Sequence, residues 1–331
     1  MIGRTIENKY RLDAELGKGG MGTVYRAARL LIGDTVAVKI LHPELVKDEQ
    51  SAERFRREAQ AAARLKHPNV VTVYDFGITD DGLVYLVMEL IEGESLRGII
   101  KQNGALPLAT AAEITRQICA ALDEAHEAHI VHRDMKPDNV IVRQTPQGLR
   151  VKVLDFGIAK LRDAAPAANN LTQTGTVLGT PFYMSPEQCM GEEIDHRADI
   201  YSVGVILYEM LVGAVPFNSP TPTAVAVQHA TQQPTPPRAI NMGIPAAVEA
   251  VVLHALQKRR ESRPQTAGAL ARELTDEIND ATLVRHAPAM PSTQQAAPPP
   301  PPNVNSGTMP TVVMSNSAWQ SGAMPQVGAS P

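Results

Sequence analysis

A run of glycines near the amino terminus is the first pattern in the chain that could contact a phosphate. Residues 16–24, LGKGGMGTV, have the spacing GxGxxG at Gly17, Gly19 and Gly22. Glycine has no Cβ, so such a turn lets backbone amides come close to phosphate oxygens. Dinucleotide-binding domains use the same spacing but lead into a helix, whereas residues 23–25 here are strand formers. The pattern predicts a phosphate-binding hairpin, with a merely flexible turn as the alternative.

Lys39 ends a second pattern, the strand-like segment Val36-Ala37-Val38-Lys39. Because side chains alternate along a strand, Lys39 points opposite to Val38 and Ile40. If Val38 and Ile40 face the core of their own sheet, Lys39 faces a cleft. Without a partner there, it would be an ordinary solvated lysine.

A helix expected over roughly residues 50–65 supplies that partner. At about 100° per residue, Glu58 lies at the edge of the apolar stripe that contains Phe55, Ala59 and Ala62. Glu53 points nearly the opposite way, toward solvent. We therefore expect Glu58 to accompany the buried face toward Lys39.

A third pattern joins His132-Arg133-Asp134-Met135-Lys136-Pro137-Asp138-Asn139 to Asp155-Phe156-Gly157. Together with the two earlier motifs, and in the same order, these residues resemble the signature set of protein kinases. Lys136 and residues 179–187, GTPFYMSPE, resemble the serine/threonine class rather than the tyrosine class. Ser185 replaces the usual alanine and Met135 the usual leucine, both mild departures. The chain is thus similar to bacterial eukaryotic-like (Hanks-type) serine/threonine protein kinases.

The resemblance implies a role for each catalytic position. Phosphoryl transfer needs mainly positioning and charge neutralisation. Asp134 would orient the substrate hydroxyl, and Lys136 would neutralise the γ-phosphate. Asn139 and Asp155 would bind Mg²⁺, with Mn²⁺ as an alternative.

The resemblance also implies an ATP site between two lobes. Lys39, fixed by Glu58, would hold the α- and β-phosphates, while apolar side chains enclose the adenine next to a gatekeeper at Met88 and a hinge at residues 89–91. The implied ATP-binding residues are Leu16, Gly17, Gly19, Gly22, Val24, Ala37, Lys39, Met88, Glu89 and Ile91.

Two further resemblances concern support rather than chemistry. Residues 199–204, DIYSVG, resemble the central helix of the family, whose Asp199 braces the catalytic loop. Arg263 matches the arginine that pairs with Glu187. The alternative is a surface ion pair worth about 0–1 kcal/mol, but the motif positions favour a buried pair.

The elements that position these residues change type along the chain. Residues 10–89 consist mainly of short β-branched runs divided by turn signals, whereas helical periodicity dominates from residue 96 onward. We expect an α+β, bilobal protein-kinase fold with a five-stranded antiparallel sheet plus one helix over a mainly α-helical lobe. The small lobe would span residues 1–91, the large lobe 92–278, and a Pro/Ala/Ser-rich disordered tail 279–331.

Composition excludes several other classes of protein. The net charge of −4 gives no support to nucleic-acid binding or to a membrane-surface role. Cys119 and Cys189 have no metal-ligand spacing, which suits a reducing, cytoplasmic location. The longest apolar stretch, residues 203–217, is interrupted by Glu209 and Gly213 and predicts a buried helix rather than a membrane span. The chain is either a soluble kinase or part of a longer one.

Regulation is predicted at the loop between Asp155 and Glu187. Thr172 and Thr174 resemble phosphorylated positions of bacterial membrane-linked kinases, and the Arg133 position pairs with such a phosphate in this family. Autophosphorylation is our hypothesis, and solvated threonines are the alternative. Related kinases often pair through their small lobes, so a transient homodimer is a further expectation.

Three classes of function compete. The kinase interpretation predicts protein substrates that carry Ser or Thr. A pseudokinase or scaffold would normally lack at least one of the five family residues, all of which are present. An interaction module built on the proline-rich tail would leave them unexplained. The five residues are Lys39, Glu58, Asp134, Asn139 and Asp155.

Overall fold

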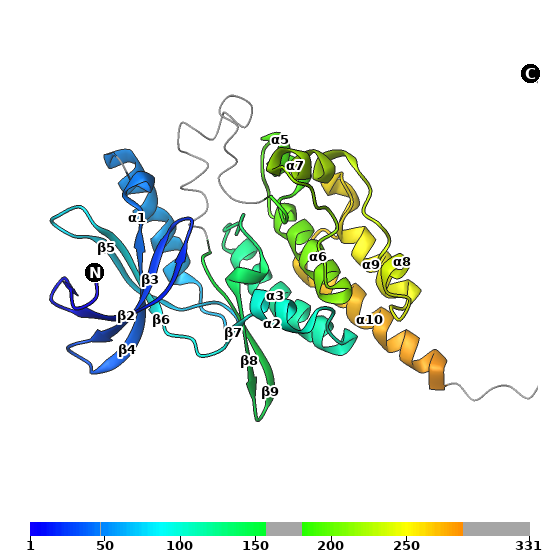
Figure 1. Ribbon diagram of the computed structural model, residues 1–331, viewed down its shortest axis with the longest axis horizontal. Coiled ribbons are helices and arrows are strands. Elements are labelled where there is room, and N and C mark those ends of the chain that lie inside the picture. Colours follow the sequence, from blue (N-terminus) through cyan, green and yellow to red (C-terminus); the bar gives the residue numbers. More distant parts are fainter. Residues whose placement is uncertain (47, 157–180, 287–331) are drawn as a thin grey trace, which may run out of the picture. The chain divides into compact units, whose positions relative to one another are not determined.

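The structure is a computed structural model that describes residues 1–46, 48–156 and 181–286 (Figure 1). Strands dominate the amino-terminal part and helices the remainder. The strands are β1 (Thr5–Ile6), β2 (Tyr10–Gly19), β3 (Gly22–Arg29), β4 (Asp34–Leu41), β5 (Val73–Ile78), β6 (Val84–Glu89), β7 (Glu94–Ser95), β8 (Val140–Thr145) and β9 (Gly148–Val153). The helices are η1 (Pro43–Leu45), α1 (Glu49–Arg64), α2 (Leu96–Asn103), α3 (Leu108–Glu127), η2 (Pro137–Asn139), α5 (Pro186–Met190), α6 (Arg197–Val212), α7 (Pro222–Thr231), α8 (Pro237–Ile240), α9 (Ala246–Ala255), η3 (Arg260–Ser262) and α10 (Ala267–His286).

The small lobe is an antiparallel sheet with strand order β1-β2-β3-β4-β6-β5. Five of these strands are those expected from the sequence, and the two-residue β1 is an addition. Ile6 is fully buried in the core of the sheet. Its burial brings the amino-terminal segment alongside Tyr10, across a turn in which Glu7 and Asn8 have positive φ.

Helix α1 packs on the sheet through the face that its sequence predicts. Phe55, Ala59 and Ala62 are its buried residues. Asp48 caps the start of the helix: its side chain accepts a hydrogen bond from Ser51 N at 2.7 Å, which satisfies an otherwise unpaired amide. Phe55 contacts Phe76 of β5 edge to face, with ring centroids 6.1 Å apart.

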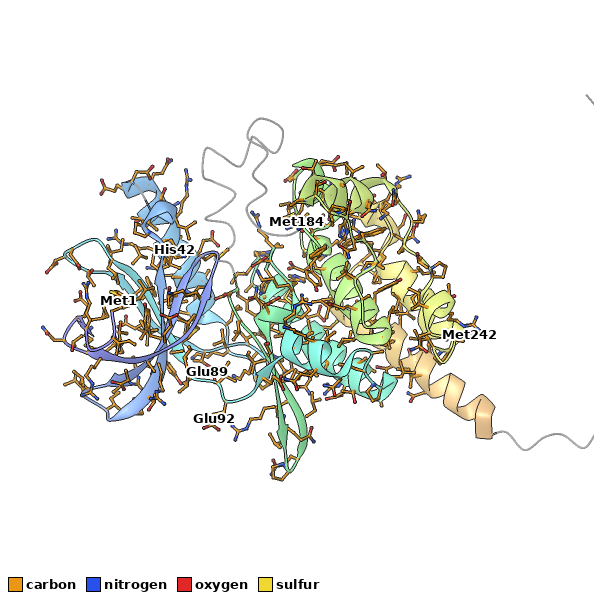
Figure 2. The ribbon with its side chains drawn as sticks, viewed as in Figure 1. Met1, His42, Glu89, Glu92, Met184 and Met242 are labelled. Carbon is orange, nitrogen blue, oxygen red and sulfur yellow. The ribbon has the colours of Figure 1, made fainter. Side chains whose placement is uncertain are left out.

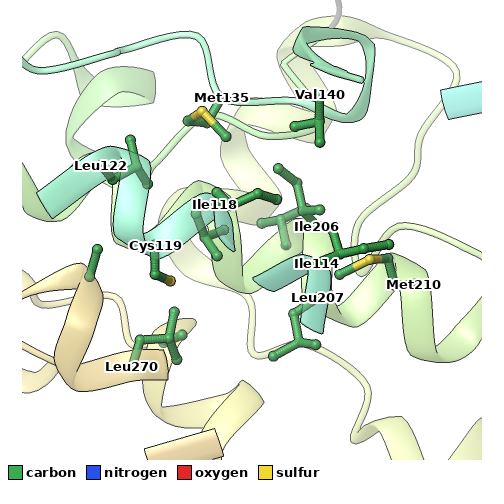
Figure 3. Packing of buried hydrophobic residues seen from close by; sticks show 14 of the residues in the cluster. Ile114, Ile118, Cys119, Leu122, Met135, Val140, Ile206, Leu207, Met210 and Leu270 are labelled. Carbon is green, nitrogen blue, oxygen red and sulfur yellow. The ribbon is translucent and has the colours of Figure 1, made fainter. Parts of the chain in front are cut away.

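The large lobe is built around α6, which is buried on nearly all sides. A helix that is apolar all round belongs inside a protein core, so the expectation of a buried helix in this stretch is confirmed. Figure 3 shows Ile206, Leu207 and Met210 of α6 facing Ile114 and Ile118 of α3, with α10 nearby. Within the described residues, no helix is both long and apolar enough to span a membrane.

Main-chain bonds join the two lobes behind the site. The segment 69–71 pairs with β9: Val71 N donates to Val153 O at 3.0 Å, and Val153 N donates to Asn69 O at 2.8 Å. Asn69 is also held by Gln117 of α3 at 2.7 Å. The chain crosses between the lobes at residues 90–93, flanked by Glu89 and including Glu92, both labelled in Figure 2.

Helix α10 continues to His286, past the boundary at residue 278 expected from the sequence. The rest of the predicted tail, residues 287–331, lies outside the described residues, as do Gly157, Thr172 and Thr174.

Candidate active site

Asp199 of α6 fixes the segment that carries Asp134. Its carboxylate accepts hydrogen bonds from His132 N and Arg133 N, each at 2.8 Å, and contacts His126 Nε2 at 2.8 Å. Burial alone would raise the pKa of Asp199, but the bond from His126 holds that pKa below its ordinary value. The predicted brace of the catalytic loop is therefore confirmed.

The backbone that follows is unusual for its residue types. Arg133 has φ 66° and Asp155 has φ 60°, in the left-handed region that non-glycine residues seldom adopt. Such conformations persist where surrounding bonds fix the chain, and they cluster at functional sites. At Arg133 that bonding comes from Asp199 and from Gln188 Nε2, which donates to Arg133 O at 2.7 Å.

Asp134, Lys136 and Asn139 form one bonded group. Lys136 Nζ donates to Asp134 Oδ2 at 2.6 Å, and Asn139 Nδ2 donates to Asp134 O at 2.8 Å. The Asp134 side chain is 26% exposed, so a substrate hydroxyl can reach it. Because the Asn139 amide nitrogen is bonded to Asp134, its amide oxygen is left for a cation.

Lys39 and Asp155 meet between the lobes. Lys39 Nζ lies 2.7 Å from Asp155 Oδ2, and the Lys39 side chain is only 6% exposed. Burial alone would raise the pKa of the Asp155 carboxyl, but the Lys39 ammonium holds it below its ordinary value. Leu154 N donates to Asn139 O at 2.9 Å, which places Asp155 beside the Asp134 group. Residues from three separate motifs, at positions 36–39, 132–139 and 155–157, therefore converge on one place.

Glu58 is half-buried on α1, next to the buried Ala59. In the described part of the chain, however, the ion pair of Lys39 goes to Asp155 and not to Glu58. The left-handed turn at Asp155, two residues after the end of β9, brings its carboxylate to the ammonium. The expected contact between Lys39 and Glu58 is thus not the one in this structure.

The predicted adenine side is an apolar cluster. Ala37 and Met88 pair across β4 and β6 and are buried together with Val71. Val24 and Ile91 pack against them, so four predicted residues share one surface, while Leu16 is 52% exposed on β2. A cavity behind Met88 is lined by Ala59, Ala62, Val70, Val71, Val73, Leu86, Met88, Asp155 and Phe156.

The glycine-rich hairpin joins β2 to β3, with Gly17 opposite Val24 and Gly19 opposite Gly22. A Cβ on Gly22 would lie 2.1 Å from Ile40 O, so this position requires glycine. Gly17 has no heavy atom within 4 Å of such a Cβ, which leaves open space over the hairpin. These surroundings agree with a loop that a phosphate can approach.

The Glu89 side chain has a role that the sequence did not reveal. Its Oε1 accepts bonds from Thr72 N at 2.7 Å and from Lys152 Nζ at 2.5 Å, and Lys152 also donates to Val70 O at 3.0 Å. Lys152 therefore ties the large lobe to the hinge residue. Its alternation with buried Val151 and Val153 marks it as pointing out of the large-lobe core, but no motif names its partner.

The segment after residue 180 is anchored by a buried ion pair. Arg263 Nη1 and Nη2 lie 2.7 and 2.8 Å from the two oxygens of Glu187, and both side chains are almost completely buried. Burial alone would raise the pKa of Glu187, but the Arg263 guanidinium holds it below its ordinary value. The prediction of a buried structural pair is confirmed.

The comparisons with known proteins show which family the chain belongs to. Residues 10–275 match the family model described as the protein kinase domain. The chain therefore belongs to the protein kinase domain family, and the bilobal fold expected from the sequence is confirmed.

Curated relatives give the closer context. The chain is 44% identical over 278 residues to the serine/threonine-protein kinase pkn3 of Myxococcus xanthus. The aligned region covers 82% of this chain and 50% of the relative. It is 43% identical over 272 residues to the serine/threonine-protein kinase PknB of Mycobacterium tuberculosis, covering 81% of this chain and 43% of the relative. The chain thus spans about half the length or less of these relatives.

Among solved structures, the kinase domain of PknI from M. tuberculosis is similar, with a TM-score of 0.68 at 26% identity. The match covers 84% of this chain and 99% of that one.

Proposed function

We propose that this protein is a serine/threonine protein kinase that transfers the γ-phosphate of Mg-ATP to Ser and Thr hydroxyls of proteins. The observation that carries the proposal is the convergence of Lys39, Asp134, Lys136, Asn139 and Asp155 within a chain of bonds of 2.6 to 2.9 Å. This set combines two cations for phosphate oxygens, oxygen donors for a hard metal ion, and a carboxylate for an alcohol. The relatives named as serine/threonine kinases support the same activity.

Each residue has a defined part in this proposal. Asp155 and the free amide oxygen of Asn139 would hold Mg²⁺, or Mn²⁺ in its place, and the ion would neutralise phosphate charge. Asp134 accepts the hydrogen bond of the substrate hydroxyl and takes its proton as the oxygen attacks the γ-phosphorus. The bond from that phosphorus to the oxygen bridging to the β-phosphate breaks, and ADP leaves. Lys136, already 2.6 Å from Asp134, is placed to neutralise the transferred group.

Lys39 would change partners when nucleotide binds. Phosphate oxygens would replace Asp155 at its ammonium, which frees the Asp155 carboxylate for the cation. Glu58 would then fix Lys39 from α1, as the sequence predicts. Replacing Glu58 with Gln should therefore weaken ATP binding and transfer while leaving the fold intact.

The decisive experiment replaces Asp134 with Asn. We expect loss of labelling of a generic basic protein by about 10²–10⁴-fold, the usual contribution of a positioned base, with nucleotide binding retained. Asp276→Asn, an exposed carboxylate on α10, is the matched control and should keep full activity. Phosphoamino acid analysis of the product should show phosphoserine and phosphothreonine. Equal labelling by wild type and Asp134→Asn would refute the proposal in favour of a pseudokinase that binds nucleotide as a scaffold.

We extend the proposal to activation by autophosphorylation at Thr172 and Thr174, which lie outside the described residues. Arg133 supports it, because its backbone is fixed directly before Asp134 and a phosphate bonded there would couple the loop to catalysis. Mass spectrometry after incubation with Mg-ATP should find phosphate on these threonines, and Thr172→Ala with Thr174→Ala should lower activity. An unmodified loop in a fully active enzyme would contradict this.

A cytoplasmic location and transient pairing of small lobes complete the proposal. The two free cysteines suit a reducing compartment. Leu31 and Ile32, at the turn between β3 and β4, are 84% and 65% exposed and offer an apolar contact for a second copy. Leu31→Glu should abolish any concentration-dependent dimer seen by sedimentation, and an unchanged dimer would exclude this surface.

A further inference from the structure

Arg97, in the first turn of α2, bridges three segments that no motif connects. Its Nη1 donates to Glu209 Oε1 of α6 at 2.7 Å, its Nε donates to Asp138 Oδ2 at 3.3 Å, and its Nη2 bonds the Tyr183 hydroxyl. The guanidinium also lies 5.3 Å from the centroid of the Tyr183 ring. Tyr183 in turn donates to Glu209 Oε2 at 2.5 Å.

Two of these segments belong to the site already described. Asp138 stands between Lys136 and Asn139 in the loop that carries Asp134. Tyr183 lies in the segment that resembles the substrate-docking loop, and its carbonyl accepts a bond from Ser202 Oγ at 2.6 Å. The Arg97 guanidinium therefore sits where the catalytic loop meets the docking segment.

The carboxylates of Asp138 and Glu209 form an acidic site that binds the Arg97 guanidinium. Glu209 is 7% exposed and Asp138 is 52% exposed, and Arg97 itself is 33% exposed, so the group reaches solvent on the Asp138 side. Carboxylates in this arrangement bind planar, forked cations strongly. Arg97 holds the position that an arginine side chain of a bound protein substrate could otherwise take.

We propose that Arg97 is a specificity-determining residue: its guanidinium fills the acidic site of Asp138 and Glu209, so that the enzyme does not select substrates with an arginine near the phosphorylated Ser or Thr. This inference rests on the proposed kinase function. It predicts that the wild type gains no rate from an arginine near the acceptor. Arg97 acts here by excluding a charge, because a second cation would meet both repulsion and occupied acceptors.

The test compares a neutral serine peptide with a set of peptides that carry one arginine, scanned over the three positions on each side of the serine. The wild type should use all of them with kcat/KM values within about threefold. Arg97→Ala should raise kcat/KM for at least one arginine peptide about tenfold relative to the neutral peptide, since the vacated carboxylates gain a partner. Adding Asp138→Asn to Arg97→Ala should remove most of that gain.

Two controls separate folding from specificity. Arg97→Lys keeps a cation in place and should keep the wild-type ratio between peptides. Nucleotide binding and thermal unfolding of each variant verify the fold, and Arg97→Gln, which keeps length and polarity, replaces Arg97→Ala if that variant unfolds.

The outcomes are distinct. If the wild type phosphorylates no peptide or protein, the proposed function fails. If the wild type is active but Arg97→Ala and Arg97→Gln lose activity on all peptides equally, or leave the ratio unchanged, Arg97 is a structural residue and this inference fails. A wild type that already prefers an arginine peptide by more than tenfold would also overturn it.

Discussion

The catalytic loop and the glycine-rich hairpin face the same site, but buried charged groups hold the loop and exposed strand pairing holds the hairpin. Beneath the loop, Asp199 is 1% exposed and holds two backbone amides and a histidine, while the Arg263–Glu187 pair is buried nearby. The hairpin, by contrast, is exposed from Glu15 to Gly20 and held by strand pairing. Groups that must stay at a fixed distance from a hydroxyl are anchored by buried charge. Groups that must close over a nucleotide are held by a strand pair whose end is open to solvent.

The largest loss of stability is expected from Arg263→Ala, which removes the buried support of the catalytic loop. Removing one partner of a buried ion pair leaves Glu187 charged and unpaired, which costs about 3–5 kcal/mol. Chemical denaturation should show this loss in the free energy of unfolding. The control Arg259→Ala, whose side chain is 83% exposed, should stay within about 0.5 kcal/mol of the wild type. A loss below about 1 kcal/mol at Arg263 would show that the loop does not depend on buried charge.

A smaller loss of stability is expected from Gly22→Ala in the glycine-rich hairpin. The new Cβ would lie 2.1 Å from Ile40 O, so β3 or β4 must shift at a cost of about 1–3 kcal/mol. Nucleotide binding should weaken as well, because the hairpin moves with its strand. Gly20→Ala, whose Cβ would meet no heavy atom within 4 Å, is the matched control and should leave stability nearly unchanged. Equal effects of the two substitutions would contradict the model of a hairpin held by the close β3–β4 contact.

The pH dependence of stability should also show that buried charged groups support the catalytic loop. Burial alone would raise the pKa of both Asp199 and Glu187. His126 holds the pKa of Asp199 below its ordinary value, and Arg263 does the same for Glu187. A depressed folded-state pKa contributes stability that is complete above about pH 4 and is lost as the pH falls below it. We expect the free energy of unfolding to fall by about 1–2 kcal/mol between pH 4.5 and 3 through these groups. Glu187→Gln should lessen this acid sensitivity even though it lowers stability at neutral pH, and an unchanged slope would contradict the assignment.

The smallest effect concerns the hinge. Lys152→Met keeps most of the side-chain length but removes the bonds to Glu89 and Val70. We expect ATP affinity to change by about two- to threefold with little change in stability, because both partners are about one quarter exposed. Titration with a fluorescent nucleotide would measure it, with Lys101→Met on the exposed face of α2 as the control. A change above about tenfold would place the hinge among the rigid parts of the site.

The resemblance to the signature set of protein kinases identified the residues that form the site. Asp134, Asn139 and Asp155 converge as expected, and the buried Arg263–Glu187 pair and the Asp199 brace have the geometry that their motifs predict. The bilobal fold followed because strand and helix periodicities separate cleanly near residue 96.

Contacts set by packing between distant segments were beyond the sequence. The pairing of Lys39 with Asp155 spans 116 residues, and the bond from Arg97 to Glu209 spans 112. Neither follows from local periodicity, since an ammonium or guanidinium can donate to any carboxylate that the fold brings near. Strand β1 was missed for a related reason: two residues carry no periodic signal, and its formation depends on the burial of Ile6.

The backbone bonds between residues 69–71 and β9 give the two lobes a shared pivot. A rocking motion about this axis leaves the Val71–Val153 contact in place. Asp155 follows the end of β9 by only two residues. If the cleft opens about this axis, we expect Asp155 to move little and the glycine-rich hairpin to move farther. Nucleotide exchange would then proceed by moving the hairpin rather than the proposed metal ligands. The amide protons of Val71 and Val153 should be among the slowest in the molecule to exchange with solvent.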